Sequence, residues 1–184
     1  CNASYKKWAG KCEACGSWNS LIEDNGLSIG PKGKTLGTQR GTIITLNNES
    51  LIKDCIVSLK DICDEIIVVD SLSDDKTVTI AEELGAKVYL QDFLGDGPQK
   101  ILAASYSSND WVFSLDADER LDNDLISYVK NLDLNNTDLK AFSFKRRNYC
   151  GKKWIKAASF YPDRVTRLYN KNFTGYTDST SHAY

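Results

Sequence analysis

The 184-residue sequence lacks methionine altogether, has one histidine and three prolines, and contains no run of 18 apolar residues. Without such a run no segment has the pattern of a membrane-spanning helix, and no secretory signal peptide is visible at the start. Since even an initiating methionine is missing, we expect a fragment or a processed product. The net charge of −2 gives no global reason to expect nucleic acid as a partner.

The residues that are present have the composition of a globular protein, with 41% hydrophobic and 26% charged residues. The length suits one medium domain plus a small appendage. Basic residues are unevenly placed, because residues 140–171 hold ten Lys or Arg and a single acid, Asp163. Such a run is either a solvated face or a surface for an anionic ligand.

The six cysteines fall into two groups. Three of them stand among apolar residues and are predicted to be small core side chains, namely Cys55, Cys63 and Cys150. The other three are clustered near the start, at Cys1, Cys12 and Cys15. In a chain without a secretory signal this clustering favours a metal over a disulfide, although a structural Zn²⁺ site needs four ligands.

The composition and apolar periodicity of the sequence divide it into three parts. Residues 1–23 hold the clustered cysteines, residues 24–41 are glycine-rich without apolar periodicity and are predicted to be a linker, and residues 42–184 form the main domain. In that domain we expect strands at 42–46, 64–70, 87–91 and 110–118, and helices at 50–63, 75–86, 99–108 and 122–132. This alternation predicts an α/β fold with a parallel sheet, followed by further strand signals at 141–149 and 163–170.

Polar side chains follow the predicted strands at their carboxyl ends, where parallel α/β sheets bind ligands. Asn47, Asp70 and the pair Asp116 and Asp118 occupy such positions. The residues after Asp70 have two interpretations. Ser73 or Asp74 can cap the next helix, whereas Asp70 itself can accept hydrogen bonds from a nucleotide base or ribose, and both can hold together.

The segment "SLDADER" at 114–120 places Asp116 and Asp118 one residue apart at the end of a buried strand. Like charges this close repel each other, and burial adds a desolvation cost. A hard divalent cation such as Mg²⁺ or Mn²⁺, which takes one or two carboxylates together with phosphate oxygens, would neutralise them. Glu119 is then expected to be a charge at the start of the next helix.

The stretches "IITLNNES", "IIVVDSLSDDKT", "GDGPQK", "NDWVFSLDADERL" and "FYPDRVTRLYN" together resemble family 2 glycosyltransferases. Within that family they are most similar to the bacterial lipopolysaccharide-core β-glucosyltransferase branch, over about residues 42–184. The resemblance implies a GT-A fold, a Rossmann-like and mostly parallel sheet with helices on both faces. It also implies a nucleotide-sugar donor, inversion at the anomeric carbon and a divalent metal.

The resemblance also implies roles for individual residues. Asp70 matches a uridine-contacting acid, which favours a UDP-sugar, and Asp118 matches the direct ligand of metal and diphosphate, with Asp116 beside it. The donor-binding positions are Thr45, Asn47, Glu49, Asp70, Gln99, Lys100 and Asp116. The positions expected near the acceptor or a phosphate are Asp163, Arg164 and Arg167.

The chain departs from the family pattern near its end, where Ala183 stands at a position that is commonly glutamate, and at Ile101, where the family usually has asparagine. An inverting transferase needs a base to take the proton of the acceptor hydroxyl. Asp178 and His182 are the candidates for this base, and His182 can equally be a tail residue in a polar segment.

Residues 1–23 resemble the N-terminal zinc finger of RadA/Sms DNA-repair proteins, through Trp8, Gly10, Trp18 and the cysteines. No Walker A motif follows, so the ATPase of those proteins is absent.

From the family 2 resemblance we expect a hexosyltransferase acting on a cell-envelope glycan or lipid-linked acceptor, located in the cytoplasm or peripherally at the inner face of the cytoplasmic membrane. The alternatives are a zinc-finger module that binds nucleic acid and an inactive fragment that binds nucleotide sugar.

Overall fold

The computed structural model of the chain describes residues 39–156 and 161–178. The predicted zinc-finger-like segment 1–23, with Cys1, Cys12 and Cys15, lies outside the described residues, as does His182. Among the helices that are described, none has the length and apolar character needed to cross a membrane.

Strands and helices alternate through the first part of the domain, as the sequence predicts. In chain order the elements are β1 (Gln39–Thr45), α1 (Ile52–Leu59), β2 (Glu65–Asp70), α2 (Thr77–Glu83), β3 (Lys87–Leu90), α3 (Asp96–Ser105), β4 (Trp111–Asp116), α4 (Asn123–Lys130), β5 (Ala141–Arg146), β6 (Tyr149–Cys150), β7 (Lys153–Trp154) and β8 (Asp163–Asn170).

Two elements begin earlier than the sequence pattern suggests. β1 starts at Gln39, inside the predicted linker, and α3 starts at Asp96, before the helix that was predicted at 99–108. Gly95 directly precedes α3 with a φ of 102°, a conformation that glycine adopts readily. Pro98 then falls in the first helical turn, where a missing N–H costs no intrahelical hydrogen bond.

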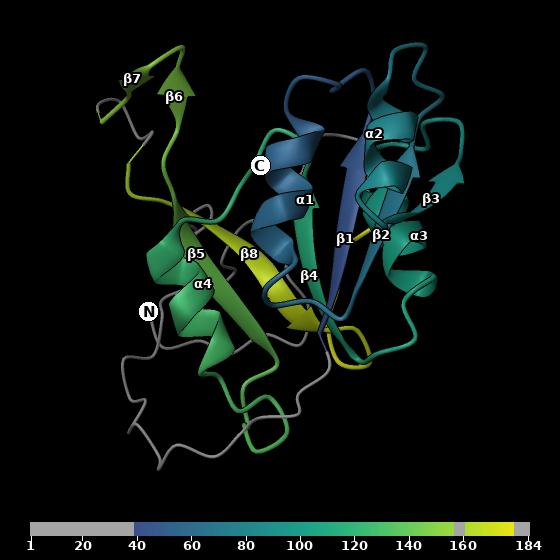
Figure 1. Cartoon of the computed structure of the whole chain (residues 1–184). Helices are drawn as coiled ribbons and strands as arrows, with labels where there is room; N and C mark the ends of the chain where they lie inside the picture. Colours follow the sequence, from purple (N-terminus) through teal and green to yellow (C-terminus); the bar gives the residue numbers. More distant parts are fainter. Residues whose placement is uncertain (1–38, 157–160, 179–184) are drawn as a thin grey trace.

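The main sheet has six strands in the order β3-β2-β1-β4-β8-β5. The first four are mutually parallel, and β8 runs antiparallel to both of its neighbours. In the register of β1, Thr45 lies opposite Asp70 and Ile44 lies opposite Asp116. The carboxyl ends of β1, β2 and β4 are therefore level with one another (Figure 1).

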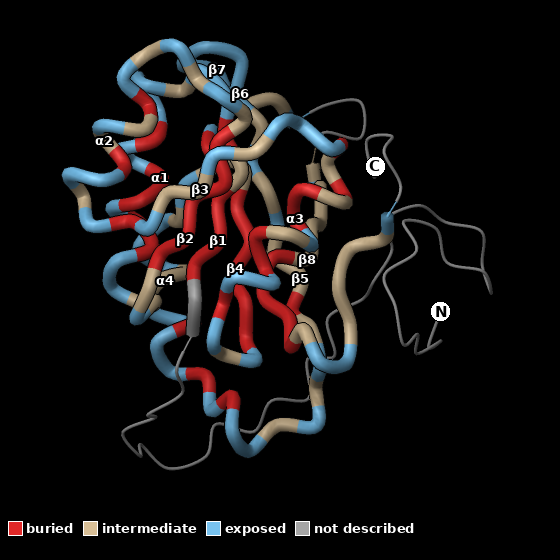
Figure 2. Tube along the Cα trace, turned by 90° about the vertical axis from the view of Figure 1, so that its right-hand side faces the viewer, coloured by how far each residue is buried: buried red, intermediate tan, exposed pale blue. Residues whose placement is uncertain are grey.

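Helices cover both faces of this sheet, and separate clusters of buried apolar residues lie between the helices and the strands. On one face α1, α2 and α4 pack on the sheet, with Ile56, Ala81 and Val129 among the buried residues. On the other face Ala103 of α3 packs against Ile67 and Val69 of β2. The central strands β1, β2 and β4 are accordingly buried along most of their length (Figure 2).

The three cysteines predicted to be core residues have different environments. Cys55 is buried in the main core, and Cys63 is partly buried against it. Cys150 is exposed, so that prediction was wrong for this residue. The reason is that Cys150 belongs to β6, which among the described strands pairs with β7 alone, in a two-stranded hairpin that projects from the end of β5 (Figure 1).

The antiparallel direction of β8 decides what meets at the carboxyl edge of the sheet. β8 begins at that edge, where Asp163 pairs with Arg146 at the end of β5. Side chains from the start of β8 and the end of β5 therefore join those that follow β1, β2 and β4.

Candidate functional site

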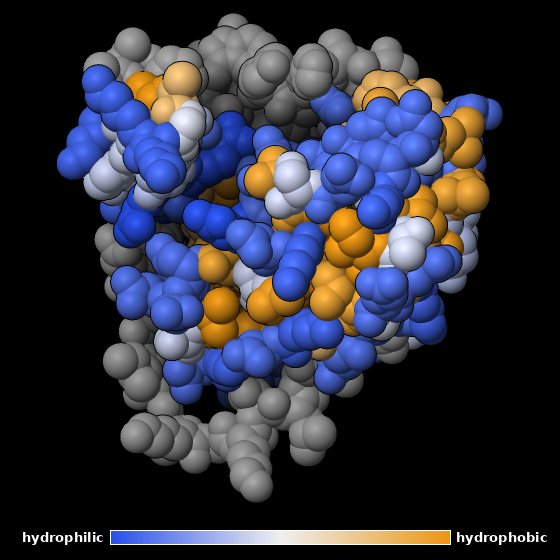
Figure 3. Space-filling view, turned by 45° about the horizontal axis from the view of Figure 1, so that its top comes forward, coloured by the Kyte–Doolittle hydropathy of each residue, from blue (hydrophilic) through white to orange (hydrophobic). Residues whose placement is uncertain are grey.

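The candidate site lies at the carboxyl edge of the sheet, around β1. The chain proceeds from β1 to β2 and β3 on one side and returns to β4 on the other, which is the strand reversal where α/β sheets bind ligands. Figure 3 shows this face with the top of Figure 1 brought forward: hydrophilic residues cover much of it, and hydrophobic residues gather on the side of β3. Exposed apolar residues after the strands include Leu72, Phe93 and Leu94.

The loops after β1 and β2 are joined through Asp70 and Ser73. The Asp70 side chain is fully buried and accepts hydrogen bonds from the Ser73 backbone N–H at 2.7 Å and from Ser73 Oγ at 2.5 Å. Ser73 Oγ in turn accepts from the Asn47 backbone N–H at 2.8 Å, and Asn47 Oδ1 accepts from the Asp74 N–H at 3.0 Å. The acid at the end of β2 thus organises the loop that surrounds it.

Further contacts between the same two loops involve Glu49. Its backbone N–H donates to Asp75 at 3.1 Å, and its carboxylate accepts from the Lys76 N–H at 3.1 Å. Capping of α2 by Ser73 or Asp74 was a wrong prediction. The helix begins only at Thr77, and the side chain that accepts from the Thr77 N–H, at 2.9 Å, belongs to Asp75.

Gln99 and Thr45 are both buried beside these loops. Gln99 Nε2 donates to Ser71 Oγ at 3.2 Å, and its Oε1 accepts from the Leu94 N–H at 3.3 Å, so that α3 is tied to the loops before it and after β2. Thr45 Oγ1 is buried and makes no hydrogen bond within the described residues.

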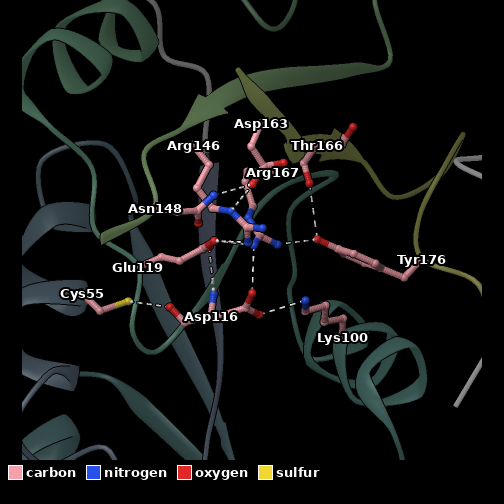
Figure 4. Close-up of polar contacts among 10 residues, drawn as sticks. All are labelled: Cys55, Lys100, Asp116, Glu119, Arg146, Asn148, Asp163, Thr166, Arg167 and Tyr176. Atoms are coloured by element: carbon pink, nitrogen blue, oxygen red, sulfur yellow. Dashed lines mark hydrogen bonds and ion pairs between the residues drawn. The ribbon is translucent and has the colours of Figure 1, made fainter. Parts of the chain in front are cut away.

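Asp116, at the end of β4, contacts two basic side chains (Figure 4). Lys100 Nζ lies 2.8 Å from one carboxylate oxygen and Arg167 Nη2 lies 2.8 Å from the other. Burial by itself would raise the pKa of Asp116, but the attraction of Arg167 and then of Lys100 holds it at about 2. The charge on this carboxylate is therefore neutralised by the protein itself.

Glu119 is the second carboxylate bound to Arg167. It lies 2.6 Å from Arg167 Nη2 and 3.2 Å from Arg146 Nη1, and its other oxygen accepts from the Asp116 N–H at 3.3 Å. The expectation of a charge at the start of the next helix was therefore wrong for Glu119. That helix, α4, is capped instead by Asp122, which accepts from the Leu125 N–H at 2.9 Å.

The residues expected near the acceptor or a phosphate lie at the start of β8. Asp163 accepts from Arg146 Nε at 2.8 Å and from Asn148 Nδ2 at 3.0 Å. Arg167 is buried, with Nη1 donating to the Tyr176 hydroxyl at 3.3 Å in addition to its two carboxylate contacts. Burial alone would lower the pKa of Arg167, but the surrounding anionic groups raise it well above its usual value, so the guanidinium stays charged.

Asp118 has different surroundings, although it is only two positions beyond Asp116. It is exposed and, within residues 39–156 and 161–178, forms no ion pair and no hydrogen bond to another residue, although its own backbone N–H and the charge of Arg146 partly offset the repulsion it experiences. Partial desolvation, followed by repulsion from Asp116 and Glu119, raises its pKa. Repulsion of this kind is relieved by a bound cation, and a single carboxylate together with substrate oxygens suits Mg²⁺ or Mn²⁺.

The proposed metal and base residues are only partly described. No group of three or more His, Cys, Asp or Glu that could hold a metal occurs in the described part of the chain. Asp178 is exposed, at the end of the described residues.

Sequence reasoning missed the contacts of Glu119, Arg146 and Tyr176 with Arg167 or its partners. Arg146 is 27 residues from Glu119, and Arg167 is 48 residues from it. No local spacing signals a pairing over that separation. The sequence signal that could have indicated these ion pairs is the cluster of ten basic residues at 140–171. Because this segment has a single acid, acids from elsewhere in the chain are needed to balance its positive charge.

Comparison with known families gives two matches. The model of "Glycosyl transferase family 2" matches residues 42–183, and the model of "Rubredoxin metal binding domain" matches residues 1–23. Both resemblances seen in the sequence are thereby confirmed.

Three curated proteins are similar to the chain, two of them named as glycosyltransferases and one as a DNA repair protein. An uncharacterized glycosyltransferase of Rickettsia bellii is 38% identical over 145 residues, which cover 76% of this chain and 49% of that protein. The lipopolysaccharide core biosynthesis glycosyltransferase LpsC of Rhizobium meliloti is 33% identical over 112 residues, covering 58% and 41%. The DNA repair protein RadA of Brucella abortus is 40% identical over 53 residues, covering 27% and 11%.

The chain spans about half the length of the Rickettsia relatives that it matches. The family match nevertheless covers the described sheet, its flanking helices and the carboxylates after β4. The chain belongs to glycosyl transferase family 2.

Proposed function

We propose that this protein transfers a hexose from a nucleotide-diphosphate sugar to a cell-envelope glycan or lipid-linked acceptor, with inversion at the anomeric carbon. The observation that carries the proposal is Asp118, an exposed carboxylate without a side-chain partner in the described residues, at the carboxyl edge beside β1. An unpaired acid with a raised pKa at this edge is typical of a functional group rather than of a structural one.

The donor nucleotide is assigned to the loops after β1 and β2. Thr45 ends β1, and Asn47 and Glu49 belong to the loop that follows it. Asp70 ends β2, and Gln99 ties the loop after β2 to α3. Because these loops are already bonded to one another, little ordering is needed when the nucleotide binds. A UDP-sugar is favoured by the match of Asp70 to a uridine-contacting acid.

Asp118 is assigned to a divalent cation, Mg²⁺ or Mn²⁺, shared with the diphosphate. When bound, such a cation offsets the charge that develops on the leaving diphosphate. Lys100 is held within the site by Asp116, which keeps a second cationic group close to the donor side. The residues that remain for the base are Asp178 and His182, which would accept the proton of the acceptor hydroxyl as it attacks.

The acceptor is assigned to the basic side of the site. Lys145, Lys152 and Lys153 are exposed at the end of β5 and on the hairpin that follows, and Arg164 at the start of β8 lies opposite Lys145. Positive charge of this kind suits a phosphorylated acceptor close to a membrane surface. LpsC, by its name, acts in lipopolysaccharide core biosynthesis. For the present protein we infer that it acts in the cytoplasm, at the inner face of the membrane.

Asp118→Asn tests the proposal. We expect this variant to lose Mn²⁺-dependent hydrolysis of a UDP-sugar, because the amide cannot replace the carboxylate as a charged ligand. Asp124→Asn is the matched control, since Asp124 is an exposed acid in the first turn of the nearby α4. Unchanged Mn²⁺-dependent turnover in the Asp118 variant would contradict the proposal.

A second function is suggested for the N-terminal segment alone. Its match to a rubredoxin metal-binding model, together with the similarity to RadA, supports Zn²⁺ binding by Cys1, Cys12 and Cys15. If the segment also bound DNA, the intact chain would retain DNA on a filter in a salt-dependent manner. We expect no such retention.

A further alternative is an inactive fragment of a transferase. Nucleotide binding without sugar transfer to any acceptor would indicate such a fragment.

A further inference from the structure

We propose that the face at the carboxyl edge of the sheet docks on a lipid bilayer that contains anionic phospholipids. Two parts of this face make the contact. The basic hairpin, residues 145–156, binds the lipid phosphate groups, and an apolar patch on the loops after β2 and β3 enters the boundary between head groups and acyl chains. The inference rests on the proposed function, because a lipid-linked acceptor requires that the site face the bilayer.

The basic hairpin carries positive charge that the protein does not balance. It contains six Lys or Arg and no Asp or Glu. Arg146 and Arg147 contact acids elsewhere in the chain. Lys152, Lys153 and Lys156 are exposed and form no ion pair with another described residue. An anionic lipid surface supplies the missing counter-charge, and each Lys or Arg close to such a surface strengthens binding.

An aromatic side chain lies among these cations. Lys156 Nζ is 4.2 Å from the centroid of the Trp154 ring, and the guanidinium carbon of Arg147 is 5.4 Å from it. The Tyr161 ring packs edge-on to the same ring at 5.1 Å, and Tyr149 on the neighbouring strand is exposed. Trp and Tyr are enriched where proteins meet the head groups of a membrane. The hairpin thus combines the aromatic and cationic residues that are typical of a membrane interface.

The apolar patch is formed by two loops that lie next to each other. Its members are exposed residues in or beside the loops after β2 and β3, namely Leu72, Leu90, Phe93 and Leu94. Gln99 joins the two loops, because its amide nitrogen donates to Ser71 Oγ and its amide oxygen accepts from the Leu94 N–H. The apolar side chains are therefore presented on a fixed surface, and exposed apolar patches mark contact with a membrane or a partner.

The strand order places the basic hairpin and the apolar patch on opposite sides of the site. β3 and β5 are the two edge strands of the main sheet, and the acids that follow β4 lie between them. Figure 3 shows this face, with hydrophobic residues gathered on the side of β3. An anionic bilayer matches both parts, because it attracts the cations on one side and accepts apolar side chains on the other. The site between them would then face an acceptor held in the bilayer.

Sedimentation of the full chain with lipid vesicles tests the proposal. We expect binding to vesicles of equal parts phosphatidylglycerol and phosphatidylcholine, and weaker binding as the salt concentration rises. Lys152→Ser with Lys153→Ser should weaken binding by about thirtyfold, since each lysine near an anionic surface contributes about a factor of five.

Lys60→Ser with Lys140→Ser is the matched control for this double variant. Both are exposed lysines at the opposite edge of the sheet, because Lys60 follows α1 and Lys140 precedes β5. We expect the control to bind vesicles as the unaltered chain does. Absence of binding by the unaltered chain, or equal losses in the two double variants, would overturn the proposal.

Phe93→Ser tests the apolar patch. We expect binding on the order of tenfold weaker, and a loss that persists at high salt, because burial of an aromatic ring is not screened by ions. Phe173→Ser is the matched control, since Phe173 is 58% exposed against 59% for Phe93 and follows β8 at the opposite edge. Unchanged binding in Phe93→Ser, or the same loss in Phe173→Ser, would overturn the role of the patch.

Vesicle binding is measured without donor sugar and without Mn²⁺, so this inference and the proposed function fail separately. A chain that hydrolyses a UDP-sugar with Mn²⁺ but does not bind the anionic vesicles would overturn this inference alone. A chain that binds the vesicles but shows no Mn²⁺-dependent hydrolysis would overturn the proposed function and leave the docking face in place.

Discussion

Asp116 and Asp118 are separated by one residue, and the protein gives them opposite electrostatic surroundings. Asp116 lies between Lys100 and Arg167, which lower its pKa, whereas partial desolvation and neighbouring acids raise the pKa of Asp118. Residues two apart on one strand would point to the same side, but β4 ends at Asp116 and the chain turns at Asp118. One acid can therefore contact the buried ion cluster while the other is exposed.

The first prediction for individual residues concerns how the free energy of unfolding depends on pH. The folded pKa of Asp116, about 2, lies below the unfolded carboxyl pKa of about 4. The ionised carboxylate therefore stabilises the fold above pH 4, and this contribution, on the order of 2 kcal/mol, is lost as the pH falls through 2. Urea denaturation between pH 2 and 5 measures it.

The charge-balanced variant Lys100→Met with Asp116→Asn serves as the comparison in that experiment. It lacks both the carboxylate and one of its cations, so its free energy of unfolding should change less over the same range. Equal slopes for the variant and the unaltered chain would show that Asp116 is not the titrating group.

At the scale of elements, the loops after β1 and β2 form one hydrogen-bonded unit. Asn47 is central to it, because its backbone N–H donates to Ser73 and its side chain accepts from Asp74. Asn47 also has a φ of 48°, in the left-handed region that asparagine and glycine tolerate best. Its side chain and its backbone conformation are thus both suited to this position.

We therefore expect Asn47→Ala to lower the free energy of unfolding by more than Asn47→Gly does, by about 1 kcal/mol. Both variants lose the side-chain bond to the Asp74 N–H, but only alanine adds a strained left-handed conformation. Chemical denaturation of the two variants measures the difference. Equal losses would mean that the φ of 48° does not persist in solution.

At the scale of the whole molecule, the chain joins a segment at 1–23 that matches a metal-binding family model to a domain at 42–183 that matches the glycosyltransferase model. The two proposed metal sites use different chemistry. Thiolates select Zn²⁺, whereas an exposed carboxylate with phosphate oxygens selects Mg²⁺ or Mn²⁺. The sites should therefore be separable by mutation.

We expect Cys12→Ser to lose bound Zn²⁺ while Mn²⁺ affinity stays unchanged, because Asp118 belongs to the other part of the chain. A colorimetric assay of zinc released on denaturation measures the first effect, and paramagnetic resonance measures the second. Cys150→Ser is the matched control, since Cys150 is an exposed cysteine outside the N-terminal cluster. A loss of Mn²⁺ affinity in Cys12→Ser would show that the two sites are coupled.

Local sequence patterns sufficed for much of the fold. The helix predicted at 50–63 is present as α1, and the alternation of strands with helices predicted the parallel part of the sheet. The same patterns failed for Cys150, because burial of a two-residue strand depends on whether the sheet extends beneath it. They also failed for the cap of α2, whose first turn begins later than Ser73 suggests.

The sequence by itself determined the family, the elements and the acids at the ends of β2 and β4, because periodicity and motif spacing are local properties. Only the tertiary structure decided how those acids are neutralised. β8 runs antiparallel beside β4, and this direction brings Arg167 to Asp116 across 51 residues of sequence. Ion pairs depend on distances in space, and strand direction, which local spacing does not encode, sets those distances here.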